Sequence, residues 1–330
     1  MRYALRLSLP RLGLSLVTLL AVSLIIFWAV EWLPGDPATR ILGQGATPER
    51  VAVLREQMRL DDPPLQRYLQ WLSDFARGDW GVSLVSSLPA SVASAGGRTQ
   101  RPVADMVLPR LRNTLILAAA AMILYIPVSL LLGIVTAVYR ERRFVAWLSA
   151  LVLVGTAVPE FVVGILLLLT FAVVLPWFPP LSMIDQAQSV PELLRMLTLP
   201  AVTLTLAMTA YAVRMMQTSL IAVLESDYVR MATLKGLSRQ RVILLHALPN
   251  ALGPALRVTV LNVAWLIGGV VLVENIFNFP GIGQMLVDSI RLLDTPVIEA
   301  IAMILASVYI LANLGADLAA AALNPRLRTG

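Results

Sequence analysis

Six apolar stretches, each long enough to cross a membrane as a helix, restrict what this chain can fold into. A hydrocarbon core about 30 Å thick needs roughly 20 apolar residues in a helix. The stretches are Leu12–Leu33, Leu115–Val138, Phe144–Phe178, Leu197–Leu224, Ala251–Val273 and Val297–Leu318. Of the 330 residues, 58% are hydrophobic and only 14% are charged, against about 25% charged residues in soluble domains. The hydrophobic core of a water-soluble protein could not bury so many apolar residues. The sequence predicts an all-α, polytopic membrane protein with six transmembrane helices.

The first and third stretches differ from a simple straight span. The first follows N-terminal arginines, as a signal peptide also would, but its apolar run exceeds the roughly 7–15 residues of a signal core and no A-x-A-like cleavage site follows. We expect a retained first helix. The third is too long for one straight crossing and contains Gly155, Pro159 and Gly164, so we expect a broken or kinked helix there.

Basic residues in short loops predict the orientation, because such loops resist translocation. Arginine and lysine gather in 140–143, 230–241 and 326–328, on the same side as the N-terminal arginines. Both termini are therefore expected in the cytoplasm and residues 34–111 outside it.

This topology predicts four parts of the chain. They are 1–33, a tail and first helix; 34–111, an extracytoplasmic segment; 112–324, a five-helix core with a cytoplasmic loop at 225–250; and 325–330, a tail. Within the outer segment we expect helices near Pro48–Met58 and Pro64–Ala76, and a mobile tip over Ser83–Arg101, which is rich in serine, alanine and glycine.

The chain has no cysteine and one histidine, His246, so no disulfide framework or Cys/His zinc cluster is available. We expect no metal and no cofactor. His246 itself is expected to make hydrogen bonds at a helix end.

The 225–250 loop is basic yet patterned like a short helix. Ser226 or Asp227 can cap its N-terminus, Lys235 suits the C-terminal end of the helix dipole, and Gly236 can take the left-handed position that follows a helix. One apolar face is expected at positions i, i+3 and i+4: Tyr228, Met231 and Ala232. Two interpretations stay open, a docking surface for a partner or a helix that lies on anionic headgroups.

This loop resembles the cytoplasmic signature of binding-protein-dependent ABC importer permeases, E-A-A-x-x-x-G, nine residues, then I-x-L-P. Ala232, Gly236 and the pair Leu248-Pro249 match, whereas Arg230, Met231 and His246 replace the glutamate, the first alanine and the isoleucine. Arginine in place of the glutamate is usual in the branch that handles dipeptides, oligopeptides and nickel.

Further segments resemble landmarks of that branch in order, over essentially the whole chain. They are Leu33–Pro37, Gly78–Ser83, Asp227–Arg230, Lys235–Ser238, Val273–Phe277, Pro280–Gly283 and Asn324–Arg328. The chain departs from the branch at Gln217, at Glu160 and in the length of the 83–101 tip.

The resemblance implies a type I permease fold in a bacterial inner membrane, importing peptides or peptide-like solutes by alternating access. The implied partners are a homologous second permease, two ABC ATPase subunits and an extracytoplasmic solute-binding protein, with membrane lipid around them and no nucleic acid. The chain lacks the G-x-x-x-x-G-K-[ST] loop that holds phosphates, so a separate ATPase must hydrolyse ATP and the chain is not an enzyme. The ATPase-coupling residues implied are Asp227, Tyr228, Arg230, Ala232, Lys235, Gly236, Leu248 and Pro249.

Charges inside the spans are candidates for the translocation pathway, because burying them in a membrane is costly. Glu160 and Arg214 could contact a zwitterionic solute, or Arg214 and Asp317 could lie near the cytoplasmic ends and pair or reach the interface. The resemblance adds a gate formed by an irregular turn between the last two spans. The pathway or gate candidates are Glu160, Arg214, Glu274, Pro280 and Gly281.

Two other classes of function have their own sequence patterns. A stand-alone secondary transporter commonly shows inverted repeats and paired intramembrane acids, and a membrane-bound enzyme needs a nucleophile, a base and an orienting group. The sequence shows neither pattern.

We predict that a topology reporter at Ser94 will be extracytoplasmic and that reporters at Arg142, Gly236 and Thr329 will be cytoplasmic. The reason is the arginine content of the short loops. Reporter fusions in intact cells measure this, and a cytoplasmic signal at Ser94 would contradict six crossings with this orientation.

Overall fold

The structure is a computed structural model that describes residues 2–32, 38–39, 46–57, 60–85 and 101–322. This part of the chain contains helices and one isolated bridge, between Val82 and Pro102, and no strand. The predicted landmarks at Leu33–Pro37 and Asn324–Arg328 lie outside the described residues, as do the reporter sites Ser94 and Thr329 and most of the predicted mobile tip.

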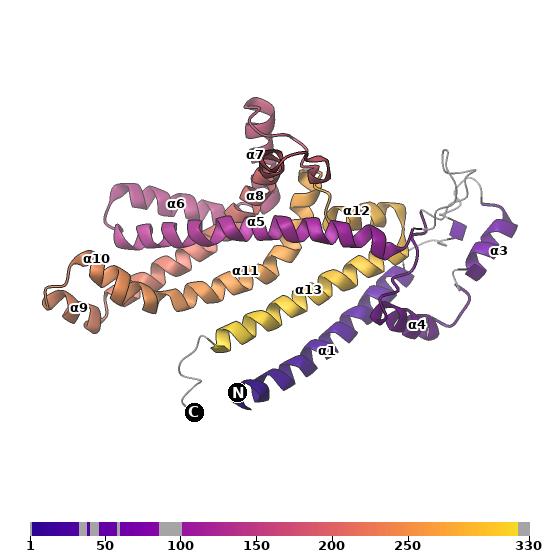
Figure 1. Ribbon diagram of the computed structural model, residues 1–330, viewed down its shortest axis with the longest axis horizontal. Coiled ribbons are helices and arrows are strands. Elements are labelled where there is room, and N and C mark those ends of the chain that lie inside the picture. The colour runs from indigo at the N-terminus through magenta and orange to yellow at the C-terminus, as the bar shows by residue number, and fades with distance from the viewer. Residues whose placement is uncertain (1, 33–37, 40–45, 58–59, 86–100, 323–330) are drawn as a thin grey trace. The chain divides into compact units, whose positions relative to one another are not determined.

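The described helices follow the expected order (Figure 1). The N-terminal part holds α1 (Arg2–Glu31), α3 (Pro48–Gln57), α4 (Pro64–Ala76) and α5 (Val103–Val138). The middle holds α6 (Arg143–Ala157), α7 (Glu160–Leu168), the π-helix η2 (Leu169–Val174), the 3-10 helix η3 (Ile184–Gln186) and α8 (Val190–Leu224). The remainder holds α9 (Asp227–Leu234), α10 (Arg239–Arg241), the π-helix η4 (Val242–Ala247), α11 (Leu248–Ile276), α12 (Ile282–Leu292) and α13 (Thr295–Ala322).

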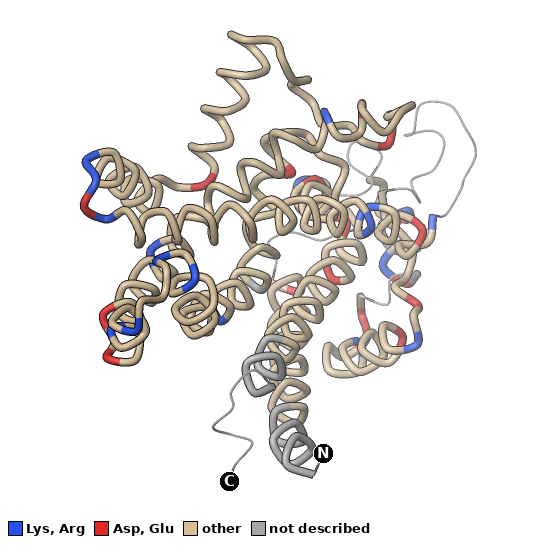
Figure 2. Tube along the Cα trace, turned by 60° about the vertical axis from the view of Figure 1, so that its left-hand side comes forward, with Lys and Arg blue, Asp and Glu red and all other residues tan. Residues whose placement is uncertain are grey.

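Five of the described helices are long and apolar enough to cross a membrane, and a bent pair of helices brings the number to six. Figure 2 shows the long helices almost wholly without charge, with basic and acidic residues concentrated at turns and helix ends. The predicted all-α fold with six spans is confirmed.

The chain forms two compact units. Unit 1 comprises residues 1–114 and 281–311, and unit 2 comprises residues 115–280 and 312–330. These units are defined by contacts within the chain, whereas the four parts predicted from the sequence are defined by their position relative to the membrane. The four parts therefore stay a prediction.

The third span is broken, as predicted. Helices α6 and α7 meet at an angle of 109°. Val158 and Pro159 are both extended at the break, with ψ of 122° and 141°. A residue that precedes proline is disfavoured in the helical region, which explains why the break falls at this pair.

Helix α8 lies at the centre of unit 2, where it packs against α6, α7 and α11. Of its most apolar window, 67% is buried, against 22% for α5. Its N-terminus is fixed by a reciprocal pair of caps: Ser189 Oγ accepts from the amide of Glu192, and Glu192 Oε2 accepts from the amide of Gln188 at 2.9 Å. A helix buried on most sides is the element around which the other spans of this unit pack.

Helix α5 approaches α8 at Gly133. A Cβ on this glycine would lie 2.6 Å from Cβ of Met216, so only glycine permits the observed distance. Gly155 of α6 also faces α8, but its Cβ would lie at an ordinary 3.7 Å from Ala210. Small residues at such contacts let helix backbones approach closely in a membrane.

Unit 1 has its own apolar core, formed mainly by α5, α12 and α13. Buried members include Val107, Ile282 and Ile301. The hydroxyl of Thr114 accepts from the amide of Ile282 at 2.9 Å, which satisfies a first-turn amide of α12 from another helix. Ser83, expected in the mobile tip, is instead buried and donates to the carboxylate of Asp294.

Two helices extend beyond the apolar stretches predicted as spans. Helix α5 begins at Val103, inside the segment expected to be extramembranous, and α8 begins at Val190 instead of Leu197. Helix α12 was not predicted. It is too short to span a membrane, and it begins directly after Gly281, where only a turn was expected.

We predict that Gly133→Ala will destabilise the protein, whereas Gly155→Ala will not. Overpacking a tight contact costs about 1–3 kcal/mol, and only the first variant forces α5 and α8 apart. Thermal unfolding of the two purified variants beside the unaltered protein measures the difference. Equal unfolding temperatures would show that the contact between Gly133 and Met216 is not tight.

Candidate functional site

The 225–250 segment of unit 2 forms α9, α10 and η4 between the ends of α8 and α11, and Figure 1 shows α9 and α10 at one extremity of this unit. The predicted short helix is confirmed and runs over Asp227–Leu234. Asp227 occupies the first turn, where its charge favours the helix dipole. Ser226, one of the two predicted caps, occupies the N-cap position, but its hydroxyl donates back to the carbonyl of Val223 at 2.5 Å and accepts from no helix amide.

The C-terminus of α9 is closed by Gly236, as predicted. Its φ is +82°, in the left-handed region that glycine enters without penalty. The amide of Gly236 donates to Thr233 at 3.0 Å, and the amide of Leu237 donates to Ala232 at 3.4 Å. These two bonds form a Schellman motif, which satisfies carbonyls that the end of a helix otherwise leaves unpaired.

Helix α9 buries one face and exposes the opposite one. Val229 and Ala232 are buried against Met216 and Leu220 of α8 and Ala251 of α11. Of the predicted apolar line Tyr228, Met231 and Ala232, only Ala232 is buried, whereas Tyr228 and Met231 are exposed.

The exposed face of α9 carries unusually large apolar side chains. Met231 is 54% exposed and Leu234 is 76% exposed, with Arg230 and Lys235 also exposed around them. We call Met231, Leu234, Arg230 and Lys235 the α9 outer face. It offers apolar contact area surrounded by basic charge.

Two contacts attach this loop to the end of α5, and a third lies within the loop. Arg140, after α5, donates to Glu225 at 2.7 Å, and Arg239 donates to the carbonyl of Val138 at 3.0 Å. Tyr228 donates to the carbonyl of His246 at 3.4 Å. The exposed ion pair contributes little stability by itself, but the contacts place the basic turns after α5 and α8 at one end of the unit. Sequence reasoning missed Arg140 and Glu225 as partners, because only the shared basic character of the two loops pointed to this proximity.

Leu248 and Pro249 begin α11 directly after the π-helix η4. Leu248 and Leu237 pack against the cluster that contains the buried Val229 and Ala232 of α9. Pro249 has no amide to donate, and the nearby carbonyl of His246 accepts from the side chain of Asn250 at 2.8 Å. These contacts involve only the backbone carbonyl of His246, so the hydrogen bonds expected of its side chain stay a prediction.

The pathway candidates lie in different surroundings. Glu160 begins α7 at the break, and its Oε2 lies 3.3 Å from where a Cβ on Gly269 of α11 would be. Glu274, near the end of α11, is completely buried. Arg214 is exposed on α8, and the side chain of Asp317 lies outside the described residues.

The two remaining gate candidates precede α12. Pro280 and Gly281 are buried. Gly281 has φ −110° and ψ −178°, an extended conformation that does not require glycine.

One polar pair inside unit 2 was not singled out from the sequence. Asn262 of α11 donates to the hydroxyl of Tyr125 of α5 at 2.7 Å, and Tyr125 is completely buried. The pair could have been found from the sequence only because both polar side chains lie within otherwise apolar spans. In the described part of the chain, no group of three or more His, Cys, Asp or Glu side chains could hold a metal ion.

Comparisons with known proteins cover nearly the whole chain. Residues 129–329 match the family described as binding-protein-dependent transport system inner membrane component, and residues 4–118 match the N-terminal region described for such membrane components. A Sinorhizobium fredii protein named a probable peptide ABC transporter permease is 35% identical over 97% of this chain and 98% of its own length. A glutathione transport system permease protein of Escherichia coli (strain K12) is 36% identical over 94% of this chain and 95% of its own.

We predict that Gly269→Ala will reduce solute uptake and that Gly268→Ala will not. The added Cβ at Gly269 would lie 3.2 Å from the ring of Trp265 and 3.3 Å from Glu160, so both side chains must shift. At Gly268 nothing lies within 4 Å, and both variants gain the same helix propensity. Transport assays on equally assembled complexes measure this, and equal uptake would contradict a role for the position of Glu160.

Proposed function

The chain belongs to the family of inner membrane components of binding-protein-dependent transport systems, and from this premise we propose that it imports peptides or peptide-like solutes with energy from separate ATPase subunits. The observation that carries the proposal is α9, a short helix with a closed C-terminus whose outer face is apolar and basic and whose inner face packs on two spans. The other coupling residues proposed are Asp227, Tyr228, Gly236, Leu248 and Pro249.

Docking of α9 into a groove of an ATPase follows from its two faces. An amphipathic helix in a groove uses apolar side chains as anchors, and Met231 and Leu234 have the size and exposure for that role. Arg230 and Lys235 can add charge contacts at the rim, where they guide association more than they add affinity.

Movement can pass from α9 to the spans through packed side chains. Val229 and Ala232 lie in one cluster with Met216 of α8 and Ala251 of α11. When the two ATPases close on ATP, α9 must move with the groove that holds it, and α8 and α11 must move with α9 because tightly packed contacts deform little. Alternation between states open to each side of the membrane is the resulting mechanism.

In this mechanism the solute passes the intramembrane polar groups. Glu160 lies at the break between α6 and α7, beside α11, and is the candidate for contact with the ammonium group of a peptide. Arg214 could meet its carboxylate. Glu274, Pro280 and Gly281 are the residues proposed for a gate.

The full transporter proposed contains this chain, a homologous second permease, two ATPases and an extracytoplasmic solute-binding protein. The two relatives are named for peptide and for glutathione transport, and glutathione is itself a small peptide, which supports a peptide-like solute. Both termini and α9 would face the cytoplasm, and α3 and α4 the outside, because of the arginine-rich short loops.

We predict that Gly236→Val will reduce uptake strongly while the complex still assembles. A β-branched residue at φ +82° meets a steric penalty on the order of 1–2 kcal/mol, which would misalign α9 in its groove without affecting distant docking sites. Uptake and ATP turnover are measured in the same assembled complexes.

The matched control is Gly78→Val. Gly78 has φ +87° and, like Gly236, no atom within 4 Å of an added Cβ, so the backbone strain is similar but falls in the 34–111 segment. Uptake by the Gly78→Val complex should stay closer to normal than uptake by the Gly236→Val complex. Normal uptake and ATP turnover in the Gly236→Val complex would reject α9 as the coupling element and favour a helix that lies on lipid headgroups.

A further inference from the structure

Helix α4 of unit 1 directs its apolar side chains to two sides. Tyr68, Trp71 and Phe75 lie toward the rest of the unit. Leu65 is 66% exposed and Leu69 is 57% exposed, four residues apart and so on one stripe of the helix. The opposite side is polar, with the side chains Gln66, Gln70, Ser73 and Asp74. A wide apolar arc facing a polar one is the pattern of a helix that lies at a membrane surface.

Helix α4 packs against the membrane-spanning part of α1. The hydroxyls of Tyr68 and Ser23 are 2.9 Å apart, and the ring centroids of Tyr68 and Phe27 are 5.5 Å apart. Ser23 precedes Glu31, the last residue of the apolar span, by eight residues, about 12 Å along a helix. Tyr68 therefore reaches well below the end of the span.

Helix α4 also packs against an apolar cluster to which a second span contributes. Phe75 packs against the unit 1 cluster that contains Ala300, Ile301 and Ile304, all within the candidate span Thr295–Gly315 of α13. Packing against the apolar part of α1 and against this cluster places α4 beside the hydrocarbon region and not in water above it.

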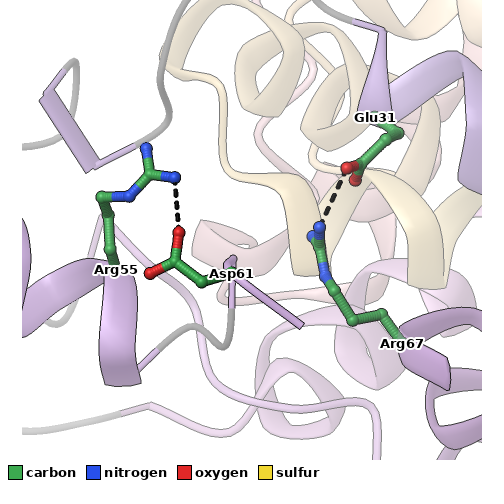
Figure 3. A network of polar contacts seen from close by, with 4 residues as sticks. All are labelled: Glu31, Arg55, Asp61 and Arg67. Atoms are coloured by element: carbon green, nitrogen blue, oxygen red, sulfur yellow. Dashed lines mark hydrogen bonds and ion pairs between the residues drawn. The ribbon is translucent and has the colours of Figure 1, made fainter. Parts of the chain in front are cut away.

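The charged side chains of α4 and its neighbours agree with a position of α4 at the membrane surface. Arg67 of α4 donates to Glu31 at 2.9 Å (Figure 3), its guanidinium carbon lies 6.0 Å from the ring centroid of Phe27, and it interacts electrostatically with Glu299 of α13. Both side chains of the Arg67–Glu31 pair are partly buried, at 19% and 26% exposure. Figure 3 also shows the more exposed pair of Arg55 and Asp61, on the segment that precedes α4. A paired arginine at the end of a span is expected at the level of the headgroups.

With the orientation proposed above, we infer that α4 is embedded in the outer leaflet of the membrane, with Leu65 and Leu69 among lipid acyl chains and the polar side of the helix toward water. The occupant of the exposed stripe is lipid, because α1, on which α4 packs, also exposes large apolar side chains such as Leu20, Leu24 and Ile25 within its span. The α4 stripe and the exposed face of α1 belong to one unit.

Single-cysteine labelling can test this directly, because the chain has no cysteine of its own. Leu69→Cys and its neighbour Gln70→Cys each receive a nitroxide spin label in the assembled transporter in lipid nanodiscs, after normal uptake has been verified. Collision rates with oxygen, which concentrates in lipid, and with a water-soluble nickel chelate are then measured.

The expected result is a several-fold lower nickel collision rate and a higher oxygen collision rate at position 69 than at position 70, which lies about 100° away around the helix. Nickel access at both positions would place α4 in water and overturn the inference. Shielding of position 69 from both reagents would also overturn it, since a partner protein would then cover the stripe.

Discussion

The close packing of α8 against its neighbours is the constraint on which unit 2 depends. In a membrane, apolar surface alone does not drive helices together, since lipid is as apolar as leucine, so association depends on close approach and on satisfied polar groups. Gly133 permits that approach to Met216, and the buried Thr205 of α8 donates to the carbonyl of Ala121 in α5 at 3.2 Å. With α8 fixed in this way, its end determines where α9 begins, and the cluster under α9 joins α8 to α11.

A short element can transmit motion only if it keeps its shape, and α9 is fixed at its C-terminal end and on one face. Its Schellman motif completes the carbonyls of its last turn, and its buried residues prevent rotation about its axis. The outer face remains available, and its large apolar side chains would be costly to leave in water. The division of α9 into a fixed face and an available face accounts for the coupling role proposed for a chain without a phosphate-binding loop.

The sequence predicted the features that depend on local chemistry. The spans follow from hydropathy, the break of the third span from Pro159, and the end of α9 from Gly236, because proline and glycine act on their own backbone. The sequence did not predict the features that depend on contacts between residues far apart in the chain. The buried face of α9 depends on where α8 and α11 lie, the start of α12 is completed by Thr114 from another helix, and the tyrosine of α4 finds its partner on α1. None of these contacts leaves a pattern within one segment.

The central claim is that the outer face of α9 binds an ATPase, and site-specific photocrosslinking tests it most directly. A photoreactive amino acid replaces Leu234 on this face in one variant and Leu261, exposed on the apolar part of α11, in a control. In the assembled transporter, illumination should attach the ATPase subunit to the first variant and not to the second, with a yield that changes when ATP is added. Attachment of lipid alone at position 234 would contradict the account and identify α9 as a helix that lies on the membrane.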